Sequence, residues 1–346
     1  MRAVVMRDRQ LTVDEVDDPV PAPGQILTRV LACGICGSDL HALAHGDQMV
    51  EMTRLSADPD LPFGPEIMDL GRDVVMGHEF CCEVVEAGEN VGNSQVGDTV
   101  VSIPILFGPA GISPLGYSNL APGGYGELML LSDVLSMKVP NGLDAHLAAL
   151  TEPMAVGLHA VRRSRAGAGT SAVVLGCGPV GLAVIAALRL EGVEHIVAAD
   201  FSPRRRELAS TMGATEVVDP RVEPAMAAWR RVDGKRKVVT FECVGVPDML
   251  DACILDAPRN SQIVVVGVCM EPDTVRPMVA VTKELNLQFV LGYDPAEFGE
   301  TLHRIAEGQL DVSPMVTGTV DLDGVPRAFA ALADPEAHAK ILVVPS

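Results

Sequence analysis

The feature that most constrains this chain is an uncharged stretch, residues 166–188, interrupted in its middle by Gly176, Gly178 and Gly181. Its length alone would allow a membrane-spanning helix. However, a β-branched run precedes these glycines, an Ala- and Leu-rich run follows them, and Pro179 suits the first turn of a helix. The stretch therefore predicts a buried strand, a tight turn and a buried helix.

The three glycines fit the pattern G-x-G-x-x-G. They lie between an expected strand and an expected helix, which is the context that a dinucleotide-binding motif requires. The first allows a tight turn, the second lets a pyrophosphate approach the backbone, and the third lets helix and strand pack closely. An acidic residue is expected about 20 residues later, at the end of the next strand, and Asp200 ends the strand expected at 195–200. The candidate cofactor-binding residues are Gly176, Gly178, Pro179, Gly181 and Asp200.

Asp200 also bears on which dinucleotide is bound. Its carboxylate can accept hydrogen bonds from both ribose hydroxyls of NAD and would repel the 2′-phosphate of NADP. Arg204, Arg205 and Arg206 complicate this, because an arginine at this place can hold a 2′-phosphate, although a basic run on a helix is also common as a solvated face. We expect NAD, with Arg205 as a further candidate contact.

The pattern around the glycine motif extends into a series of alternating strands and helices between residues 171 and 293. Such alternation predicts a doubly wound parallel sheet of the Rossmann type in an α/β protein. Residues before about 146 show short β-like runs separated by Gly and Pro, which predicts an irregular β domain. We expect a nucleotide domain at 147–293 and a second domain made of 1–146 and 294–346. The expected strands are 172–175, 195–200, 216–218, 237–242, 262–268 and 287–291, and 339–345 near the C-terminus.

The composition limits the class of protein. A chain of 346 residues with 48% hydrophobic residues is long enough for about two domains. The net charge of −20 would repel nucleic-acid phosphates and anionic membranes, so neither is an expected partner. Eight cysteines do not make a disulfide scaffold at this length, and the first ten residues contain no apolar run typical of a signal peptide. We therefore expect a cytoplasmic protein.

A second group of reactive side chains lies in Cys33-Gly-Ile-Cys36-Gly-Ser38-Asp39-Leu-His41. Gly77-His78-Glu79 and Thr151-Glu152-Pro153 follow it. With the glycine motif, these segments resemble in their order the zinc-dependent medium-chain alcohol/polyol dehydrogenase family, over the length of the chain. The resemblance implies an irregular, mainly β, GroES-like catalytic domain beside the Rossmann domain.

The resemblance also implies a catalytic zinc ion held by Cys36 and His78, since thiolate and imidazole suit Zn²⁺ and a catalytic site keeps one position open. Glu152 matches the position of a third ligand, and Glu79 is a nearby carboxylate that would coordinate in exchange with water. Which of the two glutamates is the resting ligand stays open. Cys33 is an alternative ligand, but the motif alignment favours Cys36, with Cys33 a buried small side chain.

Further roles follow from the same resemblance. Asp39 would hold His78 in the right tautomer, while Ser38 and His41 would relay the proton of an alcohol whose pKa the zinc lowers. Hydride would then pass to NAD⁺. Val156 and Val180 match apolar positions behind the nicotinamide ring, although ordinary core valines would look the same.

The chain departs from the family pattern in three places. Residues 83–176 contain no cysteine, so we expect one zinc per chain and no structural zinc, with Cys81 and Cys82 in the core. The segment Asp47–Asp73 is an irregular insertion, which either shapes the substrate site or forms an oligomer contact. The segment Ile103–Tyr125 is nearly uncharged. We expect it either to line an apolar substrate cleft or to pack where other family members have the lobe that binds the structural zinc.

These observations predict an NAD-dependent, zinc-containing alcohol dehydrogenase for a secondary, hydrophobic alcohol or its ketone. A polyol- or threonine-type dehydrogenase is the alternative that Glu152 favours. A zinc-free reductase of the same superfamily is disfavoured by the intact ligand set. A non-catalytic nucleotide-binding protein on this fold would be expected to have lost ligands and relay residues. We expect a homodimer or homotetramer.

Overall fold

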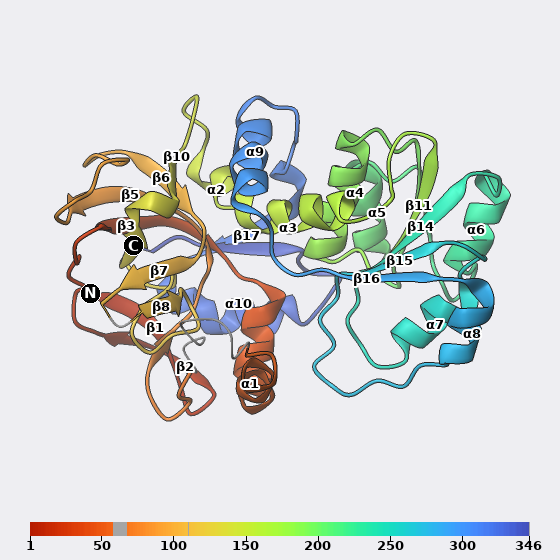
Figure 1. Cartoon of the computed structure of the whole chain (residues 1–346). Helices are drawn as coiled ribbons and strands as arrows, with labels where there is room; N and C mark the ends of the chain where they lie inside the picture. The colour runs from red at the N-terminus through yellow and green to blue at the C-terminus, as the bar shows by residue number, and fades with distance from the viewer. Residues whose placement is uncertain (58–67, 110, 346) are drawn as a thin grey trace.

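The computed structural model describes residues 1–57, 68–109 and 111–345. Figure 1 shows the N-terminal strands, coloured red to yellow, at one end of the molecule and a green-to-blue sheet at the other. Between them lie α1 (Gly37–Leu55), α3 (Thr151–Arg162) and α9 (Pro295–Ala306). None of the helices among the described residues is both long enough and apolar enough to cross a membrane.

The N-terminal part is built from three sheets. The largest sheet has the order β10-β6-β5-β3-β18-β17, and β9 also pairs with β3. Two of its strands, β17 (Val316–Val320) and β18 (Lys340–Val343), come from the C-terminal end of the chain. The second sheet is β2-β1-β4, and the third is the hairpin β7-β8. Their elements are β1 (Arg2–Arg7), β2 (Gln10–Glu15), β3 (Gln25–Gly34), α1 (Gly37–Leu55), β4 (Val74–Val75), β5 (Glu79–Ala87), β6 (Thr99–Ser102), β7 (Ile105–Gly108), β8 (Gly111–Pro114), β9 (Leu128–Ser132), η1 (Asp133–Leu135), β10 (Ser136–Lys138) and α2 (Ala145–Ala148).

The expected doubly wound sheet is present, with six parallel strands in the order β13-β12-β11-β14-β15-β16. The strands β15 and β16 are shorter than predicted, because they end at Val265 and Phe289 and not at residues 268 and 291. The elements are α3 (Thr151–Arg162), β11 (Thr170–Leu175), α4 (Pro179–Leu190), β12 (His195–Ala199), α5 (Pro203–Thr211), β13 (Glu216–Val218), α6 (Ala225–Val232), β14 (Lys237–Glu242), α7 (Met249–Asp256), β15 (Gln262–Val265), α8 (Pro277–Lys283) and β16 (Asn286–Phe289).

Both faces of this sheet are buried, which explains the continuous apolar runs of its strands. On β11, Val174 packs with α4 and α5 in one cluster, while its neighbour Val173 packs with α6 in another. Successive side chains of a strand point to opposite faces, so helices are needed on both. The sheet therefore presents the carboxyl ends of its strands as the free edge for a ligand.

The chain then returns to the N-terminal part through α9 (Pro295–Ala306), η2 (Ser313–Met315), β17 (Val316–Val320), η3 (Leu322–Gly324), α10 (Val325–Leu332) and β18 (Lys340–Val343). The last strand pairs antiparallel with β3, with Leu342 opposite Gly34 and Val343 opposite Cys33. This pairing brings the C-terminal segment beside the loop that carries the cysteine motif.

The expectation of an irregular insertion at Asp47–Asp73 is wrong for its first part. Residues 47–55 continue α1, beyond a kink at His45, which has φ −133° and ψ 33°. Gly46 lets this second half approach Leu70, because a Cβ at Gly46 would lie 2.9 Å from that side chain. Met49 and Val50 pack against the N-terminal core. Residues 58–67 of the insertion lie outside the described residues.

Candidate metal and nucleotide sites

Three candidate ligands meet between two elements of the N-terminal part. Cys36 is the residue immediately before α1, and His78 and Glu79 lie at the start of β5. One ligand atom from each lies within 4.8 Å of the others. A thiolate, an imidazole and a carboxylate are the donors that suit Zn²⁺. The residues present therefore fit a zinc ion.

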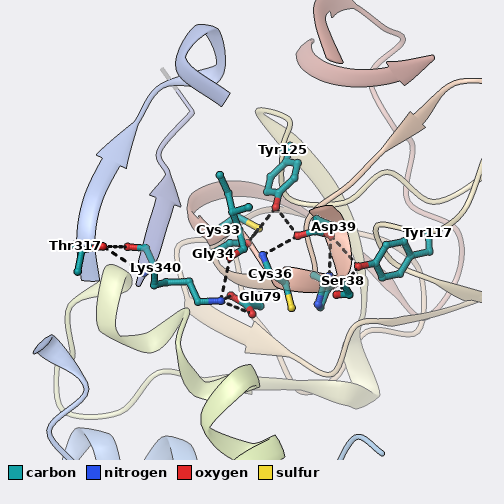
Figure 2. A network of polar contacts seen from close by, with 12 residues as sticks. Cys33, Gly34, Cys36, Ser38, Asp39, Glu79, Tyr117, Tyr125, Thr317 and Lys340 are labelled. Atoms are coloured by element: carbon teal, nitrogen blue, oxygen red, sulfur yellow. Dashed lines mark hydrogen bonds and ion pairs between the residues drawn. The ribbon is translucent and has the colours of Figure 1, made fainter. Parts of the chain in front are cut away.

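Asp39 is fully buried beside these ligands and has several partners (Figure 2). Its Oδ2 accepts hydrogen bonds from the backbone N–H of Cys36 at 2.9 Å and from the hydroxyl of Tyr125 at 2.6 Å. Its Oδ1 lies 3.4 Å from Nδ1 of His78. Burial alone would raise the pKa of Asp39, but His78, Tyr125 and the N–H of Cys36 lower it. Asp39 is therefore an ionised acceptor that faces His78.

Tyr117 joins Asp39 to Ser38. Its hydroxyl lies 2.8 Å from both Oδ1 of Asp39 and Oγ of Ser38. An ionised carboxylate can only accept, so the single hydroxyl hydrogen of Tyr117 goes to Asp39, and Ser38 donates to Tyr117. The oxygen of Ser38 can then accept a hydrogen bond from another group, since its own hydrogen is directed at Tyr117. The ring of Tyr117 also lies 5.2 Å from that of His78.

His41 follows on the first turns of α1 and is half-buried. Burial, with a smaller contribution from the charge of His45, lowers the pKa of His41. Its imidazole is therefore neutral at neutral pH and able to accept a proton.

Glu79 is held by a residue from the other end of the chain. Nζ of Lys340 lies 2.7 and 2.6 Å from the two carboxylate oxygens of Glu79 and also donates to the carbonyl of Ile35 at 3.1 Å. The side chains of Lys340 and Glu79 are 1% and 0% exposed. A buried lysine requires such a partner, so Glu79 enters the ligand group with its charge already balanced.

Glu152 lies at the start of α3, outside the group of three that meets within 4.8 Å, and is half-buried. The hydroxyl group of Tyr293 lies nearby. Burial raises the pKa of Glu152 to about 7, while the charge of His78 lowers it and that of Glu79 raises it. Glu152 is thus within electrostatic reach of the ligand group.

The glycine loop between β11 and α4 has the shape that a dinucleotide needs. Gly176 has φ +88°, and a Cβ at Gly181 would lie 1.9 Å from the carbonyl oxygen of Gly176. A Cβ at Gly178 would meet only Nη1 of Arg205, at 4.0 Å. This leaves open space above the N-terminal turn of α4, where Pro179 occupies the first helical position. The loop therefore fits a pyrophosphate.

Asp200 follows β12 beside this loop. Its Oδ2 accepts from the backbone N–H of Cys177 at 2.8 Å and lies 4.0 Å from Nη1 of Arg205. Its Oδ1 accepts from the N–H of Ser202 at 2.8 Å. The carboxylate is thus fixed at the carboxyl edge of the sheet, as expected for a residue that contacts a ribose.

The other predicted residues lie as follows. Val156 and Val180 are half-buried and pack against the core of the six-stranded sheet. Cys33, Cys81 and Cys82 are fully buried, as expected of core residues. Sequence reasoning missed Tyr117, Tyr125, Tyr293 and Lys340 as members of the site. Only Lys340 gave a signal, because a lysine inside an apolar strand calls for a buried partner.

Comparisons with known proteins show what this chain is similar to. Residues 22–141 match the family model described as alcohol dehydrogenase GroES-like domain, and residues 179–307 match the one described as zinc-binding dehydrogenase. The (R,R)-butanediol dehydrogenase of Bacillus subtilis (strain 168) is 35% identical to this chain, and the similarity covers 98% of this chain and 97% of the length of that enzyme.

Two further proteins are similar over nearly the whole chain. The sorbitol dehydrogenase of Bacillus subtilis (strain 168) is 26% identical over 100% of this chain and 98% of its own. A crystal structure of a zinc-binding dehydrogenase from Sinorhizobium meliloti 1021, bound to NADP, has a TM-score of 0.82 and 27% identity, covering 99% of both chains.

Proposed function

Since the chain belongs to the zinc-dependent medium-chain dehydrogenase family and is an NAD-dependent zinc alcohol dehydrogenase, we propose that its substrate is a small molecule with a secondary alcohol group, or the matching ketone. The observation that carries this proposal is the meeting of Cys36, His78 and Glu79, together with a Ser38 hydroxyl that Tyr117 holds in place. The relative named for (R,R)-butanediol supports a secondary alcohol.

In the proposed site, Cys36 and His78 hold the zinc, with Glu79 or Glu152 as the third protein ligand. A zinc ion there would act as a Lewis acid on the substrate oxygen. Oγ of Ser38 accepts the hydroxyl proton of the alcohol, and Asp39 orients His78 and, through Tyr117, Ser38. When Ser38 takes that proton it releases the hydrogen that it already carries, which the neutral imidazole of His41 accepts and passes on towards solvent.

The proposed cofactor site uses the loop Gly176–Gly181 for the pyrophosphate, Asp200 for the ribose and Arg205 beside it. Val156 and Val180 would lie behind the nicotinamide. We place the nucleotide domain at 147–293 and the catalytic domain at 1–146 and 294–346. This division agrees with the six-stranded sheet lying within 170–289.

An apolar substrate is supported by the segment Ile103–Tyr125, which reaches the ligand group through Tyr117. A polyol is the second candidate, supported by the carboxyl group of Glu152 and by the similarity to a sorbitol dehydrogenase. A panel of 2,3-butanediol, 2-octanol and sorbitol with NAD⁺ separates them. The apolar proposal expects a higher kcat/KM for 2-octanol than for either of the two alcohols with several hydroxyl groups, and a clear preference for sorbitol would contradict it.

We further propose that the chain forms a homo-oligomer through the outer edge of β16. Within the part of the chain that the structure describes, this strand is the last of its sheet, and α8 beside it has no buried residue. Met278, Val281, Phe289 and Leu291 are 75%, 69%, 62% and 86% exposed. Unpaired strand edges with apolar neighbours readily associate. Analytical ultracentrifugation of Phe289→Asp should then show smaller particles than the wild type.

The remaining expectations are also proposals. The net charge of −20 supports a protein whose partners are neither nucleic acids nor membranes. All eight cysteines are free thiols, which supports a reducing, cytoplasmic location.

A further inference from the structure

Two carboxylates, not one, lie where the adenosine ribose is expected. Asp200 follows β12 and Asp219 follows β13, and these parallel strands are neighbours with their carboxyl ends at the same edge. The backbone N–H of Asp200 donates to the carbonyl of Val218 at 3.3 Å, which fixes the two strand ends side by side. Asp219 was not among the residues that the motif pointed to.

Asp219 engages two arginines at once. Nε of Arg221 donates to its Oδ1 at 2.8 Å, and so does the backbone N–H of Arg221 at 3.0 Å. Nη1 of Arg206 lies 3.4 Å from its Oδ2. The hydrogen bond from Arg221 holds the pKa of Asp219 well below its usual range. The carboxylate is therefore ionised and balances charge from both guanidinium groups.

The same arginines are held beside the segment that begins with Asp200. Nη1 of Arg206 donates to the carbonyls of Asp200 and Phe201, at 2.7 and 2.9 Å. Nη2 of Arg221 donates to the carbonyl of Phe201 at 2.8 Å, and its guanidinium lies 5.3 Å from the ring centroid of Phe201. Phe201 itself is 60% exposed. Two cations thus lie next to the expected ribose, with Asp219 between them.

We propose that Asp219 is a specificity-determining residue, which excludes a 2′-phosphorylated dinucleotide by occupying Arg206 and Arg221. This inference rests on the proposed cofactor site at Asp200. A 2′-phosphate is bound best by guanidinium groups that can donate two parallel hydrogen bonds. Here Arg221 already bonds to a carboxylate and Arg206 forms an ion pair with the same one. An incoming phosphate would also face the charges of Asp200 and Asp219 together. Removing the charge of Asp219 takes away the carboxylate that the two arginines share, while their bonds to the carbonyls of Asp200 and Phe201 remain.

The test measures binding, so it does not depend on turnover. Full-length, zinc-loaded Asp219→Asn is titrated calorimetrically with adenosine 2′,5′-bisphosphate and with adenosine 5′-monophosphate. Asparagine keeps an oxygen for Arg221 to contact, and Asp219→Ser serves as a second variant. The control is Glu216→Gln, which removes another carboxylate of β13, paired with Arg231 at 2.7 Å at the opposite end of the strand.

We expect Asp219→Asn to bind the bisphosphate at least about tenfold more tightly than the wild type does, with the affinity for the monophosphate unchanged. Adding Arg221→Ala should remove the gain, and Glu216→Gln should show none. This inference alone would be overturned if the wild type binds the monophosphate but neither Asp219→Asn nor Asp219→Ser has a higher affinity for the bisphosphate. A wild type that binds neither NAD⁺ nor the monophosphate would overturn the proposed cofactor site, and this inference with it.

Discussion

Lys340 and Glu79 form a buried ion pair between the last strand of the chain and the first residue of β5, with Nζ 2.7 and 2.6 Å from the two carboxylate oxygens. Breaking a buried pair by removing one partner typically costs about 3–5 kcal/mol, because the remaining charge is uncompensated. We therefore expect Lys340→Met to lower the free energy of unfolding by about that amount in urea denaturation.

The control is Lys138→Met, which removes the cation of an exposed pair with Asp98 and should leave the transition unchanged. Combining Lys340→Met with Glu79→Gln should recover part of the loss, since no charge is then buried alone. A Lys340→Met protein as stable as the wild type would contradict the buried-pair account.

The second prediction concerns the metal. Cys36→Ala and His78→Ala should each lose zinc and turnover but stay folded, because a catalytic ion contributes less to folding than a structural one. Elemental analysis should find about one zinc per wild-type chain. Cys33→Ala is the matched control, since Cys33 is buried and its Sγ lies 3.7 Å from the carbonyl of Gly34. Two zinc ions per chain, or loss of zinc from Cys33→Ala, would contradict the proposed ligand set.

The third prediction separates the two tyrosines that contact Asp39. Tyr117→Phe removes the acceptor of the Ser38 hydroxyl, so Ser38 is no longer oriented to take the substrate proton. We expect kcat to fall about tenfold, equivalent to about 1.4 kcal/mol, with the KM for NAD⁺ unchanged. Tyr125→Phe also loses a bond to Asp39 but leaves Ser38 bonded to Tyr117. Equal losses of kcat in the two variants would show that Tyr117 acts only through Asp39.

The fourth prediction concerns the cofactor. Asp200 should make kcat/KM for NAD⁺ at least about tenfold higher than for NADP⁺, or about 1.4 kcal/mol. Asp200→Ser should narrow this ratio, because it removes the charge opposed to a 2′-phosphate. The same change removes the acceptor of the Cys177 N–H, so some loss with NAD⁺ is expected as well. Equal kinetics with both cofactors in the wild type would mean that the arginines at 204–206 dominate.

The structure could be predicted best from the sequence where the local residues allow only one backbone conformation. Gly181 has no room for a side chain, and Pro179 occupies the first turn of α4, so the motif and the start of that helix could be predicted. The parallel sheet followed from the alternation of buried strands and helices.

The partners of the site residues could not be predicted in the same way. Lys340 meets Glu79 only because β18 pairs with β3, and no local pattern specifies that pairing. Tyr117 and Tyr125 lie far from Asp39 in sequence and looked like part of an uncharged segment. Residues 47–55 looked irregular because their polar and apolar residues are mixed, yet packing of Met49 and Val50 against the core favours a helix there.

The most direct test of the whole account is NADH formation by the purified protein before and after removal of zinc. The protein is treated with a chelator, freed of it, and assayed with NAD⁺ and 2,3-butanediol at the nicotinamide absorbance, with and without added Zn²⁺. The account predicts turnover in the untreated protein, its loss on chelation and its return with Zn²⁺. Full turnover in the chelated protein, or no NADH from any secondary alcohol in the zinc-loaded protein, would contradict it.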